Sequence, residues 1–479
     1  GNEIPVDLIS YLFRKKYPDV RKYLSDLEKE DILILFTEMS HLFKYAVMRD
    51  VVYGIQLKKT LREIHGEIGT SLEILHPENI ENYFPILAYH FENAENIEKA
   101  LYYHEKAGYQ AKENYQNDQA LYHFDKASTF ISKKNKIKEN EWNYLNAEEY
   151  SDQIREFINI GLNRFHFYYA ILQNISKSSE IIYMLNELAN NINDQFLISQ
   201  TLMEMSLILT NNGQYDKSNE IIESALKLYK SLKLPYEISL AYLSLGKNNM
   251  MTGNMDKAIK YYDIAMDQAK HIDNVVKRDK IVAKIYGDKG ITFDYSGNFD
   301  KALEFYNKQL DITEKLNLKI EKSSAIGNIG VVYHLTGNLK KAKEYYERNL
   351  KIVEELGRRV EFAKILNNLG FLYKDLNNLS KAISYHKKSF SISSELNDHN
   401  TMASASVNLG HVYKIQKNFT KSEGEYLKSI ELSKKYALKH NLAEGLVELG
   451  EIYFLTSRKD KAFLSFKEGL SIAEDIGFA

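Results

Sequence analysis

Apolar residues recur at spacings of three and four along most of the chain, with polar residues between them. This spacing is typical of amphipathic helices that bury one face. After Pro235 the remaining 244 residues contain no proline. Because proline breaks helix interiors, this long stretch predicts a series of stacked helices.

A short pattern returns at a fixed interval in the same stretch. Successive copies of one glycine lie 40 residues apart, at Gly330, Gly370, Gly410 and Gly450. A small residue follows twelve positions after each glycine and precedes an aromatic ring by four positions, as Ala342 precedes Tyr346. Weaker copies centre on Gly290, Gly246, Ser206 and His166, with about four residues inserted near 272–279. The interval predicts about eight units.

Each unit is expected to form two helices joined at a turn such as Gly337-Asn338, where the backbone can become left-handed. The repeated glycine and the small residue let the two helices approach closely. The aromatic residue is expected to fill the space between neighbouring pairs. Because one pair cannot bury its apolar face alone, the pairs stack into a solenoid.

The pattern Leu-Gly-x2-Tyr, followed after a turn by Ala-x3-aromatic, resembles the tetratricopeptide repeat (TPR). The resemblance implies an all-α fold, a right-handed superhelical solenoid of helix pairs of about 40 residues. It also implies a scaffold for binding, because a repeat fold does not itself define an activity.

Residues 1–75 lack the repeat. The run 32–36 is β-prone, and 46–74 predicts one or two amphipathic helices. The segments 43–53 and 62–65 resemble the winged-helix segment of STAND-type signalling ATPases, and 87–91 with 98–100 resemble the first repeats of their arm. We therefore expect a winged-helix-like α+β domain at 1–75, irregular TPR-like helices at 76–130, a connector at 131–155 and the regular units at 156–479.

The STAND resemblance implies a regulatory arm. In that family such an arm is joined to an ATPase and to a class III adenylate or guanylate cyclase or a protein kinase. The sequence begins Gly-Asn-Glu without Met, so we expect a fragment with those domains upstream.

The amino-acid composition limits the classes of partner that the chain is expected to bind. The chain is 44% hydrophobic and has a formal net charge of −2, which excludes wholesale disorder and argues against a nucleic-acid or membrane-surface binder. No apolar run approaches the roughly 20 residues that span a bilayer. Cysteine is absent, which excludes disulfides and fits a reducing compartment, so a cytoplasmic protein is expected.

Catalytic motifs are missing from the sequence. It has no phosphate-binding Gly-x4-Gly-Lys-Ser/Thr loop, no dinucleotide fingerprint and no His-Glu-x-x-His pair. The 13 histidines are scattered, and the carboxylates lie among lysines on expected outer faces. We therefore expect that this chain is not an enzyme and that it holds no cofactor and no metal site.

The concave groove is the remaining place for a function. Its lining should come from the first helix of each pair, two residues before the repeated glycine, one after it and four after it. These positions hold Asp288, Asp294, Asn328, Val331, His334, Asn368, Phe371, Lys374, Asn408, His411, Lys414, Glu448 and Glu451.

Asn328, Asn368 and Asn408 share one phase of the repeat. A carboxamide can donate to and accept from a peptide backbone at once, which suits a clamp for an extended segment. The alternative is that these asparagines cap or bridge neighbouring helices within the stack. The charged candidates predict a mildly basic middle of the groove between two acidic ends.

The expected function is a non-catalytic interaction and sensor arm that binds a protein, a peptide or a small-molecule effector and regulates an upstream ATPase. Two alternatives stay open: a free-standing TPR adaptor or peptide receptor, and the arm of a STAND-type transcription regulator.

Overall fold

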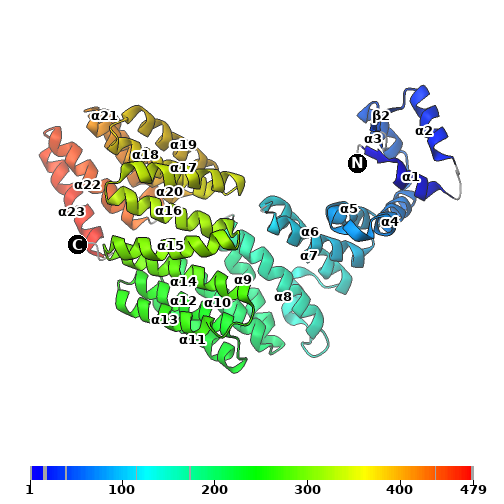
Figure 1. Ribbon diagram of the computed structural model, residues 1–479, viewed down its shortest axis with the longest axis horizontal. Helices are drawn as coiled ribbons and strands as arrows, with labels where there is room; N and C mark the ends of the chain where they lie inside the picture. The colour runs from blue at the N-terminus through cyan, green and yellow to red at the C-terminus, as the bar shows by residue number, and fades with distance from the viewer. Residues whose placement is uncertain are drawn as a thin grey trace. The chain divides into compact units, whose positions relative to one another are not determined.

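The computed structural model describes residues 3–14, 19–37, 40–114, 116–171, 174–436 and 438–475. The chain divides into two compact units, Gly1–Ile208 (unit 1) and Leu209–Ala479 (unit 2). Figure 1 labels the helices and the strand β2 along the chain.

Unit 1 begins with a small mixed domain and continues as helices. Its elements are β1 (Glu3–Pro5), α1 (Val6–Phe13), α2 (Val20–Lys29), β2 (Leu33–Thr37), β3 (Ser40–Phe43), α3 (Ala46–Gly54), α4 (Lys58–Leu75), α5 (Phe84–Asn93), α6 (Ile97–Glu113), α7 (Asn117–Asn135), α8 (Ser151–His166) and α9 (Ile175–Asn191). Short 3-10 helices lie at Pro77–Tyr83 and Glu139–Tyr144, and a π-helical turn at Phe167–Ile171. α10 (Gln195–Asn211) contains the division between the units.

The three strands form an antiparallel sheet in the order β1-β3-β2. The β-prone run 32–36 forms β2, which pairs with β3 from Leu33 opposite Phe43. Val6, Val20, Leu24 and Leu33 form the core beneath the sheet and the first two helices. The sequence at 46–74 forms two separate helices, α3 and α4.

The segment between α7 and α8 is held by buried groups. Trp142 is fully buried and stacks on Phe157 with ring centroids 4.4 Å apart. Arg164, also buried, donates hydrogen bonds to Asp125 at 2.7 Å and to Glu139 at 2.6 Å. The connector at 131–155 therefore contains the end of α7, a 3-10 helix and the start of α8, tied to α8 by an aromatic stack and an ion pair.

Unit 2 continues as helix pairs: α11 (Tyr215–Ser231), α12 (Pro235–Met251) with α13 (Met255–Ala269), α14 (Val275–Tyr295) with α15 (Phe299–Lys315), α16 (Lys319–Leu335) with α17 (Leu339–Glu355), α18 (Arg359–Asp375) with α19 (Leu379–Glu395), α20 (His399–Ile415) with α21 (Phe419–Lys435), and α22 (Lys439–Leu455) with α23 (Lys459–Asp475). α14 has 21 residues where its counterparts have 17, so the predicted insertion lengthens this helix. Pro235 is the first residue of α12, where its missing N–H costs no hydrogen bond.

The repeated glycine is the point of closest approach within each pair. A Cβ atom at Gly290, Gly330, Gly370 or Gly410 would lie within 3.0 Å of the ring sixteen residues later, which is less than carbon atoms tolerate. The ring therefore packs on the glycine of its own pair. It also reaches the next pair, because Tyr306 shares a buried cluster with Ile326 and Ile329. The aromatic residue thus fills space between neighbouring pairs, as predicted. The structure adds its contact with the repeated glycine of its own pair.

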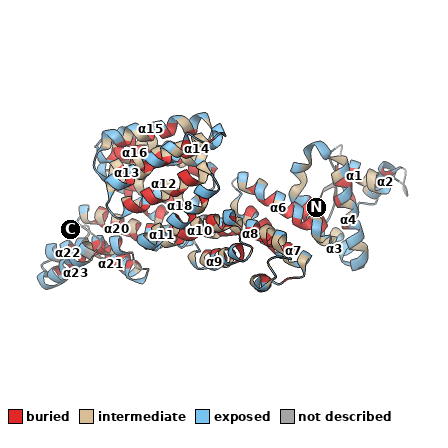
Figure 2. Ribbon diagram, turned by 90° about the horizontal axis from the view of Figure 1, so that it is seen from below, coloured by how far each residue is buried: buried red, intermediate tan, exposed pale blue. Residues whose placement is uncertain are grey.

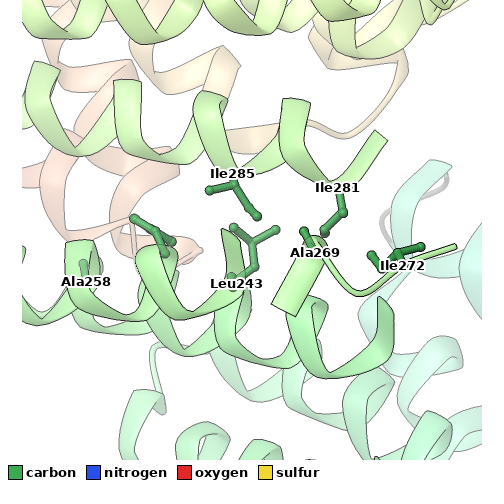
Figure 3. Close-up of a cluster of buried hydrophobic side chains, with 8 residues drawn as sticks. Leu243, Ala258, Ala269, Ile272, Ile281 and Ile285 are labelled. Carbon is green, nitrogen blue, oxygen red and sulfur yellow. The ribbon is translucent and has the colours of Figure 1, made fainter. Parts of the chain in front are cut away.

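Apolar clusters of the same kind join one pair to the next. Figure 3 shows one such cluster, which extends along α13 and includes Leu243 of α12, Ala258 and Ala269 of α13, and Ile281 and Ile285 of α14. Figure 2 shows buried positions along the faces between helices and exposed positions on the outward turns.

The turns follow the pattern that the sequence predicts, and asparagines cap the helices that come after them. The second residue after the first helix of a pair is left-handed, with φ of 71° at Gly297, 77° at Gly337 and 57° at Asn377. The side chains of Asn338 and Asn378 then accept hydrogen bonds from the third backbone N–H of the following helix.

The first helices of successive pairs contact one another: α12 with α14, α14 with α16, α16 with α18, α18 with α20 and α20 with α22. They form one continuous face of unit 2. The described residues thus form a stack of helix pairs, as the repeat predicts, together with a small N-terminal mixed domain.

Candidate binding groove of unit 2

All of the groove positions predicted from the sequence lie on α14, α16, α18, α20 and α22, the first helices of their pairs. Two of them, Asp288 and His334, are buried, and most of the others are half-buried. Their neighbours differ along the face, so each part of the groove is described separately below.

A pocket of about 220 Å³ opens between α16 and α18. Its lining includes three of the predicted positions, Asn328, Val331 and Asn368. Asn349 of α17 lines the same pocket, and its Oδ1 accepts a hydrogen bond from Ser323 at 2.6 Å. Asn328, Asn368 and Asn408, which share one phase of the repeat, form what we call the asparagine ladder. The structure brings two of its members, Asn328 and Asn368, to one pocket and adds a third amide.

These amide groups are available to a ligand. Within the described part of the chain, no hydrogen bond involves the side chain of Asn328 or Asn368. The Nδ2 group of Asn349 likewise has no partner there, although the residue is only 5% exposed. Room for this amide comes from Gly327, where a Cβ would lie 2.7 Å from Asn349 Nδ2. The pocket thus presents amide donors and acceptors without internal partners.

Charged residues line another part of the same pocket. Arg358 and Glu361 form an ion pair there, and Lys364 stands nearby with its side chain exposed. Because surface pairs of this kind exchange readily with solvent, they contribute selectivity more than affinity.

Asn408, the third member of the ladder, is engaged within the stack. Its Nδ2 donates to Oδ1 of Asn367 at 3.3 Å, and His386 donates to the same oxygen at 2.7 Å. Asn367 therefore links α18, α19 and α20. For Asn408 the bridging alternative describes the observed contact.

His334, Phe371 and Lys374 are brought together between α16 and α18. His334 donates to Asp375 at 2.9 Å, and its ring centroid is 5.0 Å from that of Phe371. Lys374 lies over the ring of Phe371 at 3.8 Å and 3.4 Å from Asp375. Asp375, which the sequence did not single out, neutralises the positive charge of this part of the groove.

His411, Lys414, Glu448 and Glu451 also gather. Lys414 donates to Glu448 at 2.6 Å and to Glu451 at 2.8 Å, and Tyr426 donates to Glu448 at 3.1 Å. Burial alone would raise the pKa of Glu448, but the contacts with His411 and Lys414 outweigh it and lower the pKa to about 2. The basic middle and the acidic C-terminal end expected from the sequence are therefore paired with each other.

Asp288 and Asp294 of α14 lie at the other end of the candidate set. Lys247 of α12 lies 3.3 Å from Asp288. Burial raises the pKa of both carboxyl groups, against the opposing effect of Lys247 on Asp288. Negative charge at this end of the groove is thus only partly compensated.

Sequence reasoning missed Asn349 and Asn367. Asn349 occupies a repeated position, since Gln309, Ser389 and Ser429 stand 40 residues apart in the same register. That series of polar residues at one buried position of successive second helices was the available signal. Asn367 gave no such signal, because its partners come from α19 and α20.

The described helices include none that is long and apolar enough to cross a membrane. A search of curated proteins finds no match to this sequence.

Solved structures similar to this chain share its fold. A STAND protein with a tetratricopeptide repeat sensor from Pyrococcus horikoshii matches with a TM-score of 0.51 and 18% identity over 99% of this chain. This chain spans 62% of that protein's length. A Rap protein complexed with Competence and Sporulation Factor matches with a TM-score of 0.54 and 12% identity, over 79% of this chain and 99% of that one. The apo quorum sensor NprR from B. thuringiensis matches with a TM-score of 0.50 and 15% identity, over 70% of this chain and 96% of that one.

The tetratricopeptide repeat family matches residues 283–316, 321–395 and 401–475. These ranges contain all or most of each helix from α14 to α23, and so cover the helix pairs that carry the groove candidates. Residues 283–475 of this chain are therefore built of tetratricopeptide repeats.

Proposed function

We propose that unit 2 binds an extended peptide segment of a partner protein in the groove, with the amides of Asn328, Asn349 and Asn368 holding its backbone. The function is interaction rather than catalysis. The observation that carries the proposal is that these three amides line one pocket between α16 and α18. Among the described residues, the side chains of Asn328 and Asn368 and the Nδ2 group of Asn349 have no hydrogen-bond partner.

The chemistry favours a peptide. Each carboxamide can donate to a backbone carbonyl and accept from a backbone N–H, so it satisfies both groups of one residue. Peptides bound in an extended form rely on such main-chain hydrogen bonds for affinity and on side-chain pockets for specificity. At about 220 Å³ the pocket is smaller than the roughly 300–1,000 Å³ of sites for drug-sized ligands, and it suits a single side chain. A small-molecule effector is therefore the weaker candidate.

We further propose that the chain is the sensor arm of a STAND-type signalling protein in the cytoplasm, and that the bound segment regulates an ATPase in the same polypeptide. The similarity to a STAND protein over 99% of this chain supports this role at the level of fold. The order β1-α1-α2-β2-β3 with a three-stranded sheet supports a winged-helix-like domain in residues 1–75.

A free-standing adaptor or peptide receptor is the second candidate. The similarity in fold to the Rap protein complexed with Competence and Sporulation Factor favours it. An ATPase domain in the same polypeptide would support the sensor arm, with a cyclase, kinase or transcription-regulating output. Its absence from the full gene would support the receptor.

Selection from a phage-displayed library of random dodecapeptides tests the binding site. We expect the wild-type chain to enrich a set of related peptides, and the Asn328→Ala/Asn368→Ala variant to fail to enrich them. Asn307→Ala is the matched control, because among the described residues this exposed asparagine on α15 bonds only to a carbonyl of its own helix. Enrichment of the same peptides by the double variant would contradict the proposed site.

A further inference from the structure

A pocket of about 670 Å³ opens in unit 1, between α3, α4 and α5. Its apolar walls come from Phe43 at the end of β3, Val52 of α3, and Leu61, Ile64 and Ile68 of α4. Although α3 carries several apolar side chains, none of its residues is buried. The volume lies within the roughly 300–1,000 Å³ of pockets that enclose a small ligand. A molecule of that size would cover apolar surface that the described residues leave open.

A chain of hydrogen bonds joins three residues of the pocket lining, Tyr53, His65 and His90. The hydroxyl of Tyr53 is 3.0 Å from Nε2 of His65, and Nδ1 of His65 is 2.9 Å from Nδ1 of His90. His65 is only 5% exposed, whereas His90 is half-buried. Among the described residues, Nε2 of His90 has no hydrogen-bond partner. The chain thus has a buried middle and one nitrogen that is available to a ligand.

This available nitrogen can serve either as a donor or as an acceptor. A neutral imidazole carries one N–H, so the protons of the chain must all be arranged in the same direction. If Tyr53 donates to His65, then His65 donates to His90, and Nε2 of His90 keeps its proton. If the bonds run the other way, Nε2 of His90 is an acceptor. The chain can therefore adapt to the polar group of a ligand without a change of charge.

The polar groups of the pocket are uncharged or paired at neutral pH. Burial lowers the pKa of His65, and burial together with the neighbouring His65 lowers the pKa of His90 to about 4. Burial also raises the pKa of the Tyr53 hydroxyl. The charged residues of the lining, Arg49 and Asp50, form an ion pair with each other. A charged ligand would lose its hydration here without gaining a counter-charge, so the pocket favours a neutral one.

Aromatic rings surround the buried histidine. The ring centroid of His65 lies 6.1 Å from that of Tyr53 and 5.5 Å from that of Tyr89, with the rings edge to face in both contacts. The ring of His90 is 5.0 Å away. All four residues line the pocket. Because aromatic rings pack well in offset-stacked and edge-to-face geometry, these walls favour a flat aromatic ligand.

We propose that this pocket binds a small, neutral aromatic molecule that carries one N–H, O–H or ring nitrogen, which bonds to Nε2 of His90. The site goes beyond the proposed function, because it lies in unit 1 and its ligand is not a peptide. The pocket of about 220 Å³ in unit 2 suits one side chain, whereas about 670 Å³ suits a whole small ligand. The site would give the chain a second input, separate from the groove.

A pair of isosteric probes tests the site on the full chain. Indole is a neutral aromatic molecule with one N–H group, and indene has nearly the same shape without that group. Titrations of both probes are followed by saturation-transfer NMR. We expect indole to bind wild type and indene to bind about fivefold more weakly, since one hydrogen bond distinguishes them. Equal affinities of the two probes, or no binding of indole, would overturn the proposal.

Two substitutions locate the bound probe. Val52→Trp fills the pocket from α3, where Val52 is 48% exposed, and should abolish binding of both probes. His90→Phe keeps a ring and removes the nitrogens, so indole should bind about fivefold more weakly, as indene does. A His90→Phe variant that still prefers indole to indene overturns the site.

His123→Phe is the matched control for His90→Phe. His123 forms the same contact as His90, with its Nδ1 2.9 Å from Nδ1 of His104, but neither residue lines this pocket. The control should bind indole as wild type does, and unfolding curves show that each variant is folded. A loss of indole binding in both variants would mean that the histidine pairs act only through the fold, and would overturn the role of His90.

A tryptophan side chain of a partner protein is the other possible occupant. N-acetyltryptophan amide carries the same indole group together with a peptide backbone. We expect it to bind no more tightly than indole. If it binds at least about tenfold more tightly, and Val52→Trp abolishes this binding, the pocket takes a protein side chain and the proposal of a free small molecule is wrong.

Discussion

The side-chain amide of Asn408 donates a hydrogen bond to the side-chain oxygen of Asn367, 3.3 Å away, and so ties α20 to α18. Asn328 and Asn368 occupy the same phase of the repeat but line an open pocket. Identical residues at equivalent repeat positions therefore make different contacts, because the residue opposite each one differs.

Asn408→Ala should consequently affect stability and leave ligand binding unchanged. Losing the bond to Asn367 should lower the free energy of unfolding by about 1 kcal/mol, the usual net value of one hydrogen bond. Asn367 keeps its bond from His386, so no buried oxygen loses all its partners. Urea unfolding followed by circular dichroism measures the change. A variant as stable as wild type that loses peptide binding would show that Asn408 belongs to the clamp.

Replacing glycine by alanine should change the free energy of unfolding in opposite directions at two positions, Gly290 and Gly424. In Gly290→Ala the new Cβ would lie 2.5 Å from Cε1 of Tyr306, so we expect destabilisation by about 1–3 kcal/mol through overpacking. Among the described residues, no neighbouring atom lies within 4 Å of such a Cβ at Gly424 on α21, and Gly424→Ala should stabilise by about 0.5–1 kcal/mol through helix propensity. Thermal unfolding of the two variants compares them directly, and equal effects would refute the close-packing account.

His386 predicts how stability depends on pH. Burial, with smaller contributions from the charges of Lys374 and His411, lowers its pKa from 6.5 to about 3. Because the folded pKa is below the unfolded one, the neutral ring stabilises the fold above pH 6.5, and this contribution is lost as the pH falls toward 3. Between pH 7.5 and pH 5 the loss should be about 2 kcal/mol.

His386→Tyr removes this titration and installs the residue found at the same position in α17 and α21. Unfolding free energies of both chains at pH 7.5 and pH 5 isolate the effect, because the other histidines are common to both. We expect the variant to lose about 2 kcal/mol less than wild type over this range. The same loss in both chains would mean that His386 does not stay neutral in the fold.

The parts of the structure that repeat were predictable from the sequence. The 40-residue interval at Gly330, Gly370 and Gly410 predicts helix pairs because close packing demands a residue without a side chain at one point of each pair. The same interval predicts which helices share a face, since α16, α18 and α20 repeat one another. In the N-terminal region the β-prone run predicts β2, but β1 is three residues long and offers no alternating pattern to detect.

Pairing across the groove was not predictable. Lys414 and Glu448 are 34 residues apart, and whether a lysine meets a carboxylate or open solvent depends on one residue of the facing helix. His334 and Asp375 show the same limit, because Asp375 lies one residue outside the expected positions. Which charges along the groove are neutralised could therefore be read only from the side-chain positions in the structure.

One measurement tests the central claim most directly. A peptide selected on the wild-type chain is titrated with wild type, Asn328→Ala/Asn368→Ala and Asn307→Ala, and fluorescence anisotropy gives the three dissociation constants. The account predicts a loss of roughly 10- to 100-fold in the double variant, from two hydrogen-bonded amides at about 1 kcal/mol each, and no change in Asn307→Ala. Equal dissociation constants for wild type and the double variant, with unchanged unfolding curves, would contradict peptide binding at this pocket.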